Sequence, residues 1–109
     1  MRALLAVTLL MACDVGTRHV ASGKLVVGQG AHGWLLFADA AGGLQVSDAT
    51  VDVFDDAVFR AHGHDPQGRA VSVTFDFRAP PRRSAAGQLT VIAGERTTVV
   101  DDARFSPID

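Results

Sequence analysis

The stretch that decides the fold lies in the middle of the chain, where residues 57–77 read AVFRAHGHDPQGRAVSVTFDF. Its centre is Asp65-Pro66-Gln67-Gly68, which has the residue types that a type I turn favours at its first, second and fourth positions. A three-residue loop that ends in a left-handed glycine is a common connection between antiparallel strands. The stretch therefore predicts a β-hairpin whose register is set by this turn.

The predicted register separates apolar from polar side chains. The apolar face pairs Ala61 with Val73, Phe59 with Phe75 and Ala57 with Phe77. The polar face pairs His62 with Ser72, Arg60 with Thr74 and Asp56 with Arg78. Because a slip of one residue would mix the two faces, the turn chemistry and the polarity pattern support the same register.

Further apolar runs, separated by Gly, Asp and Pro, lie on both sides of this hairpin. With the hairpin strands they cover residues 24–27, 34–38, 44–54, 57–64, 69–78, 88–93 and 97–105. Short runs at this spacing favour an all-β antiparallel domain, which we expect to be a small β-sandwich or a partly closed barrel. The predicted core consists of Leu25, Val27, Trp34, Leu36, Val51, Val53, Phe59, Val73, Phe75, Phe77, Leu89, Val91 and Phe105.

The connections between the expected strands are of several kinds. Asp55-Asp56 is expected to bend or bulge the long run 44–64, and the prolines within residues 79–84 predict a loop. The last hairpin is compatible with two turns. One is the two-residue turn Gly94-Glu95, and the other is a three-residue turn that also includes Arg96 and would pair Val91 with Val99.

Composition limits the class of protein. The 109 residues suit one domain, and 48% apolar with 20% charged residues exclude a disordered charged tail. The formal net charge of −2 gives no basic excess, so we expect no nucleic-acid partner. The single cysteine excludes an internal disulfide and a cysteine-built zinc site.

The first residues are typical of an export signal. Residues 1–12 read MRALLAVTLLMA, with one Arg followed by an apolar run about half as long as the ~20 residues that span a bilayer. The junction Leu10-Met11-Ala12-Cys13 resembles the lipobox of bacterial lipoproteins. That resemblance implies that the chain is cut before Cys13 and that this cysteine carries the acyl chains of a stable membrane anchor.

The same resemblance divides the chain into a signal peptide (1–12), a lipid-anchored tether (13–22) and a β domain (23–109). The protein would then sit on the cell membrane or the outer membrane, facing the periplasm or the cell exterior. Its mature part loosely resembles small all-β bacterial lipoproteins of unknown function, from which no functional residue is carried over.

A glycine-rich motif directly follows the first expected strand. The run from Gly28 to Gly33 matches the G-x-G-x-x-G pattern, in which glycines let a backbone approach a pyrophosphate. The segment after it is too short for the helix of that fold, and no βαβ units follow. We therefore expect a hairpin loop there and no nucleotide cofactor.

Two histidines flank Gly63 in the sequence His62-Gly63-His64-Asp65. On a strand both imidazoles project from one face, where they could share Zn²⁺ or Cu²⁺ with Asp65. Two histidines and one carboxylate form only a partial site, so metal binding is the alternative function and no cofactor is expected.

Two other constellations are incomplete. A nucleophilic set of His62, Ser72 and Asp76 has no G-x-S-x-G elbow, and the aspartates form no D-x-D-x-D-G calcium loop. The interpretation is a non-catalytic, lipid-anchored module that binds or scaffolds an unknown envelope protein. The alternatives are a periplasmic metal-binding protein and an enzyme of unrecognised type.

Overall fold

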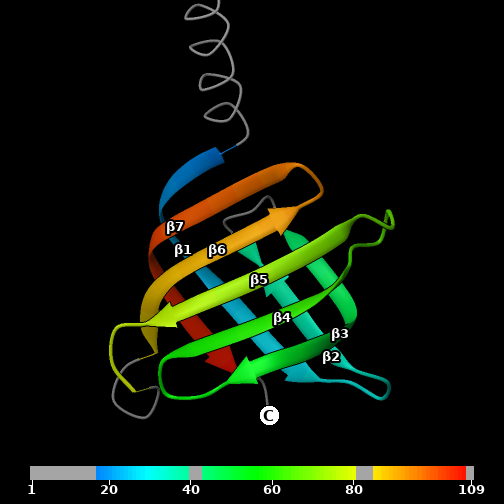
Figure 1. Ribbon diagram of the computed structural model, residues 1–109, viewed down its shortest axis with the longest axis horizontal. Coiled ribbons are helices and arrows are strands. Elements are labelled where there is room, and N and C mark those ends of the chain that lie inside the picture. The colour runs from blue at the N-terminus through cyan, green and yellow to red at the C-terminus, as the bar shows by residue number, and fades with distance from the viewer. Residues whose placement is uncertain (1–16, 40–42, 81–84, 108–109) are drawn as a thin grey trace, which may run out of the picture.

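The chain folds into a closed β-barrel in the computed structural model (Figure 1), which describes residues 17–39, 43–80 and 85–107. The described strands are β1 (Thr17–Gln29), β2 (Trp34–Ala38), β3 (Leu44–Phe54), β4 (Val58–His64), β5 (Ala70–Phe77), β6 (Ala86–Ala93) and β7 (Arg96–Pro107). The predicted all-β class is confirmed. The closure is complete in the structure, whereas the sequence left a sandwich and a partly closed barrel open.

The pair that closes the barrel is β1 with β7, and it is parallel, whereas consecutive strands pair antiparallel. Consecutive strands alternate in direction, so the first and last strands of an odd-numbered meander point the same way. Thr17 pairs with Thr97 at one end of the barrel, and Val27 pairs with Pro107 at the other. The described chain therefore begins and ends at opposite ends of the barrel (Figure 1).

The start of β1 corrects the predicted boundary of the folded domain. Residues 17–22, which the sequence assigned to the tether, form the first part of β1 and pair with β7. Arg18, His19 and Ser22 are exposed, so this part of the strand lacks the apolar alternation by which strands are recognised. Its partner strand lies at the far end of the chain, where no turn points to the pairing. Residues 13–16 lie outside the described residues, as does the signal segment 1–12.

The central hairpin has the predicted register. Phe59 pairs with Phe75 and Ala61 pairs with Val73, and all four side chains are buried. Gly68 has a φ of 84°, and its N–H donates to the carbonyl oxygen of Asp65 at 2.9 Å. The turn and the polarity pattern therefore identified the same hairpin that the structure contains.

Gly68→Val is expected to lower the free energy of unfolding by roughly 1–2 kcal/mol, because it places a β-branched residue at positive φ. No heavy atom lies within 4 Å of the added Cβ, so the cost comes from the backbone and not from crowding. Urea denaturation measures it. Gly43 also has positive φ and is no control, so Gln67→Val in the same turn serves instead. Equal stability of the two variants would contradict the turn geometry.

The remaining turns settle the type of the last hairpin and the connections that follow β1 and β3. Ala93 pairs with Arg96, so the last hairpin has the two-residue turn, and Gly94 has a φ of 63°. Asp55 forms the turn between β3 and β4, where its Oδ1 accepts the N–H groups of Ala57 at 2.8 Å and Val58 at 2.9 Å. The glycine-rich run ends β1 and connects it directly to β2, so it is a hairpin loop as predicted.

The core fills the barrel with apolar side chains from every strand. Nine of the predicted core residues are buried: Leu25, Val27, Leu36, Phe59, Val73, Phe75, Leu89, Val91 and Phe105. The buried residues that the prediction omitted from the core are Ala38, Val46, Ala49, Ala61, Val71, Val100 and Ala103. Four of these are alanines, whose single methyl group gives a weak signal in a polarity pattern.

Strand β3 departs most from the regular alternation of buried and exposed residues. Asp48 has a φ of 58°, and the register of β3 against β4 shifts between Ser47 and Thr50 and again between Val51 and Val53. Each shift changes which residues face inward. Val53 is therefore only half-buried, and the prediction that places it in the core is wrong.

Candidate functional site at the mouth of the barrel

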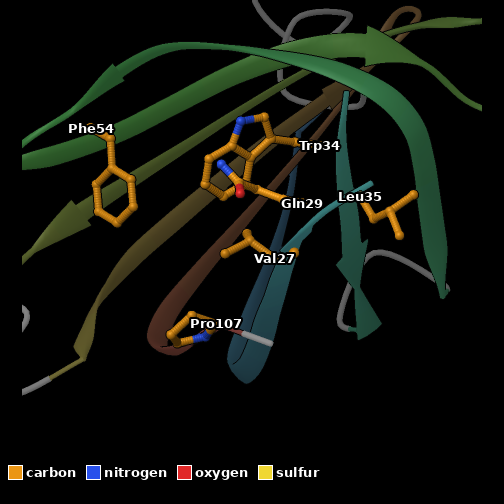
Figure 2. A pocket seen from close by; sticks show the side chains of 7 residues that line it. Val27, Gln29, Trp34, Leu35, Phe54 and Pro107 are labelled. Atoms are coloured by element: carbon orange, nitrogen blue, oxygen red, sulfur yellow. The ribbon is translucent and has the colours of Figure 1, made fainter. Parts of the chain in front are cut away.

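A pocket of about 480 Å³ lies where β1, β3 and β7 end and β2 begins. Its lining residues, which we call the mouth, are Val27, Gly28, Gln29, Trp34, Leu35, Phe54 and Pro107. Figure 2 shows the side chains of this set, with Trp34 between Phe54 and Leu35 in the view. None of these described residues is charged, and Gln29 contributes the only side-chain amide among them, beside the indole N–H of Trp34.

Aromatic rings that pack edge-to-face support the mouth from inside the barrel. The Phe54 ring centroid lies 6.5 Å from that of Trp34, 5.2 Å from Phe59 and 5.6 Å from Phe105, each pair edge-to-face. Phe105 continues the contacts to Phe75 at 5.5 Å. Edge-to-face pairs at these separations are favourable beyond the area they bury, so the cluster holds Trp34 and Phe54 in defined orientations.

Phe54 is one of the mouth residues that the sequence analysis missed, together with Leu35 and Pro107. It packs on two core rings, yet 48% of its surface remains exposed. In a strictly alternating strand that is read from Val51 and Val53, Phe54 would face away from the core. The register shifts in β3 turn its ring over the barrel end, and the sequence carries no direct signal for them.

A second apolar surface adjoins the mouth on the outer side of β2. Leu35 and Phe37 project outward with 44% and 41% of their surfaces exposed, and with Val26 they line a hollow of about 280 Å³. Leu35 borders both hollows. Strand β2 is thus apolar on both faces, whereas a barrel strand with one solvated face normally alternates.

The two candidate metal ligands on β4 lie outside the mouth. His62 and His64 are exposed, and Asp52 of β3 lies beside the first of them. The distance from His62 Nδ1 to Asp52 Oδ2 is 2.8 Å, and both side chains are well exposed to solvent. Such an exposed pair contributes little to stability.

Asp65 does not join the histidines, because the hairpin turn uses its carboxylate. The side chain is fully buried, Oδ1 accepts the N–H groups of Gln67 and Arg69 at 3.0 and 2.8 Å, and Oδ2 accepts Arg69 Nε–H at 2.7 Å. Within the described ranges, no group of three or more His, Cys, Asp or Glu side chains is arranged to hold a metal ion. The third ligand that the sequence suggested is therefore committed elsewhere.

We expect the purified protein to carry no stoichiometric metal, because the two histidines lack an available third ligand among the described residues. His62→Ala and His64→Ala should each change the free energy of unfolding by no more than about 0.5 kcal/mol, as exposed substitutions do. Elemental analysis measures the metal. One metal ion per chain that disappears in the double variant would contradict this prediction.

The carboxylate of Asp65 makes stability depend on pH. Burial raises its pKa, but the hydrogen bonds and charge of Arg69 and the Gln67 N–H outweigh that effect, so the pKa lies below the usual range. The stabilisation is therefore complete above the unfolded-state pKa of about 3.9 and is lost as the pH falls through the lower folded-state pKa.

Asp65→Asn should accordingly lower Tm at neutral pH, and its difference from the unmodified protein should shrink below about pH 4. Thermal melting from neutral pH to pH 2 measures this difference. Asp56→Asn, at an exposed position in another turn, is the matched control and should change Tm little throughout. A difference for Asp65→Asn that stays constant on acidification would contradict the role of the charged carboxylate.

The structure assembles only part of the nucleophilic set that the sequence suggested. His62 and Ser72 are paired across β4 and β5, but Asp76 pairs with Val58, two positions away from the Arg60–Thr74 pair. The carboxylate that contacts His62 belongs to Asp52. None of these residues lines the mouth, so the polar constellation and the pocket are separate features.

Comparison of the chain with models of protein families, with curated proteins and with solved structures finds no match. Within the described residues there is also no helix with the length and hydrophobicity needed to cross a bilayer.

Proposed function

We propose that the chain is a lipid-anchored protein of the cell envelope whose barrel is a non-catalytic module that binds another envelope protein. Cys13 would carry the lipid, and the protein would sit on the cell membrane or outer membrane, facing the periplasm or the cell exterior. The support for the anchor is the sequence Leu10-Met11-Ala12-Cys13 at the end of a short apolar run.

The observation that carries the binding role is the chemistry of the mouth. Its described lining is mostly apolar and uncharged, and aromatic rings from the core hold it in shape. Acid–base and nucleophilic catalysis need titratable groups beside the reacting atoms, and the described residues that line this pocket include none. A concave apolar surface with one amide suits the recognition of a partner.

The direction of β1 supports a barrel that is anchored at one end and binds its partner at the other. Cys13 precedes the first described strand residue, Thr17, by only four positions, so a lipid on Cys13 would tether the barrel at the end where β1 begins. The mouth lies at the other end of β1, and thirteen strand residues span about 40 Å. An anchored barrel can therefore hold its mouth away from the lipid surface.

Replacement of the proposed lipid site tests the anchor. The unmodified chain should fractionate with membranes and begin at a Cys13 that carries diacylglyceryl, whereas Cys13→Ala should carry no lipid. Mass spectrometry of the membrane fraction distinguishes the two. An unmodified Cys13 in the membrane fraction, or a mature N-terminus at another residue, would overturn the anchoring proposal.

Crosslinking in intact membranes tests the binding role. Leu35→Asp places a charge between the two apolar hollows and should abolish crosslinked species that the unmodified protein forms. Ile92→Asp introduces the same charge at an equally exposed apolar position on β6 and should leave these species unchanged. Crosslinking that neither substitution alters would contradict a partner surface at the mouth.

A further inference from the structure

We infer that the mouth takes an uncharged aromatic side chain from within a partner polypeptide, with the neighbouring peptide amide bonded to Gln29. This inference rests on the proposed binding function and adds the chemistry of the group that is recognised. The group is an internal Phe, Tyr or Trp residue and not a charged chain terminus.

The aromatic character of the proposed ligand follows from the rings that line the pocket. Trp34 and Phe54 are edge-to-face at 6.5 Å, and Phe54 still exposes 48% of its surface after packing on Phe59. A further ring can extend this cluster in the geometry that its members already adopt. Aromatic side chains are also the usual anchors of protein interfaces, where they fill pockets of this kind.

We infer that the bound group is uncharged from the residues that line the mouth. None of the described residues that line the mouth carries a charge, so an ammonium or carboxylate group gains no ionic partner from them, whereas an uncharged ring gains apolar contacts. Asp55 follows Phe54 directly, but its Oδ1 accepts the backbone N–H groups of Ala57 and Val58 within the turn. This described carboxylate is therefore engaged in its own loop.

The peptide character of the proposed ligand follows from the only side-chain amide in the described lining. Gln29 is exposed at the end of β1, and its amide can both donate and accept a hydrogen bond. A peptide group offers the complementary acceptor and donor, whereas a hydrocarbon offers neither. The volume of about 480 Å³ is also large beside the 150 Å³ of an apolar cavity that holds benzene, so a ring and the adjoining amides fit together.

A series of small probes tests these three features on the full chain carrying Cys13→Ala, which avoids lipid in the sample. The neutral probe is N-acetylphenylalanine amide, and its matched variants are N-acetylphenylalanine (anionic), phenylalanine amide (cationic) and N-acetylleucine amide (aliphatic). Nuclear magnetic resonance follows the indole N–H of Trp34, the only tryptophan, and the backbone amides of Gly28 and Gln29.

The neutral aromatic probe should shift these signals and bind about tenfold more tightly than each of the other three. Phe54→Ala should weaken its binding by about tenfold, and Ile92→Ala, an equally exposed apolar truncation on β6, should not. Because Phe54 also packs on core rings, Gln29→Leu provides a second variant at an exposed position. It should remove the preference for the neutral probe over toluene.

Stronger binding of the anionic or cationic probe would overturn the inference, as would toluene binding as tightly as the amide to the unmodified protein. Failure of all probes to shift the Trp34 signal would overturn it as well. These failures are distinguishable from failure of the proposed function, which would appear as an unlipidated Cys13 or as crosslinking insensitive to Leu35→Asp.

Discussion

Phe59→Ala is expected to lower the free energy of unfolding by about 4 kcal/mol. Phe59 is completely buried, and its ring centroid lies 6.2 Å from Trp34 and 5.1 Å from Phe105. Removing the ring loses its transfer free energy and leaves a cavity among aromatic neighbours that are held by their own contacts. Urea denaturation with linear extrapolation measures the loss.

Phe37→Ala is the matched control, because it removes the same ring from the outer face of β2, where 41% of the residue surface is exposed. It should cost about 1 kcal/mol or less. Since small domains are only marginally stable, Phe59→Leu provides a milder truncation if the alanine variant does not fold. Equal losses for the Phe59 and Phe37 variants would show that the aromatic cluster is not the centre of the barrel core.

Gly87→Ala is expected to cost about 3 kcal/mol or more, although it adds a single methyl group. An added Cβ at this buried position on β6 would overlap the carbonyl oxygen of Asp76 and would lie 3.0 Å from Cε1 of Phe75. The obstructing carbonyl belongs to the neighbouring strand β5 and cannot rotate away as a side chain would. The strands must separate locally, which weakens the ladder between β5 and β6.

Thermal melting or urea denaturation measures the effect of Gly87→Ala, and Gly68→Ala separates the two reasons for which glycine is needed. Gly68 has positive φ but nothing within 4 Å of an added Cβ, so its alanine variant carries only the backbone cost of about 1 kcal/mol. If Gly87→Ala were no more destabilising than Gly68→Ala, the close approach of β6 to β5 would be wrong.

The strands could be predicted from the sequence wherever the signal was local. The turn at Asp65–Gly68 fixed the register of β4 against β5, and the same register places Phe59 opposite Phe75 in the structure. Both the turn residues and the apolar alternation lie within a few positions of each other, so nothing distant in the chain was needed to recognise the hairpin.

The closure of the barrel could not be predicted in the same way. The pairing of β1 with β7 joins segments at opposite ends of the chain, and no turn connects them. Residues 17–22 are mostly polar and exposed, which is equally compatible with a tether. Their strand conformation depends on a partner that only the completed fold supplies.

The candidate site was partly visible in the sequence. Trp34 and Val27 were predicted to be core residues and do line the mouth, but their position at an open end depends on the closure of the barrel. Phe54 reaches the pocket through the irregular register of β3, which begins near the positive φ of Asp48. Whether Cys13 carries lipid stays a prediction, because that residue lies outside the described part of the chain.

The parallel pair of β1 and β7 also sets an order for folding. Every other strand pair joins neighbours in the sequence and can form early, whereas this pair joins residues 17–27 to residues 97–107 and must close a long loop. Until β7 docks, β1 and β6 each present an unpaired edge to other chains. The docking of β7 therefore converts an aggregation-prone open sheet into a barrel without edges, so a deletion within β7 should endanger solubility more than a loss of similar length within a loop.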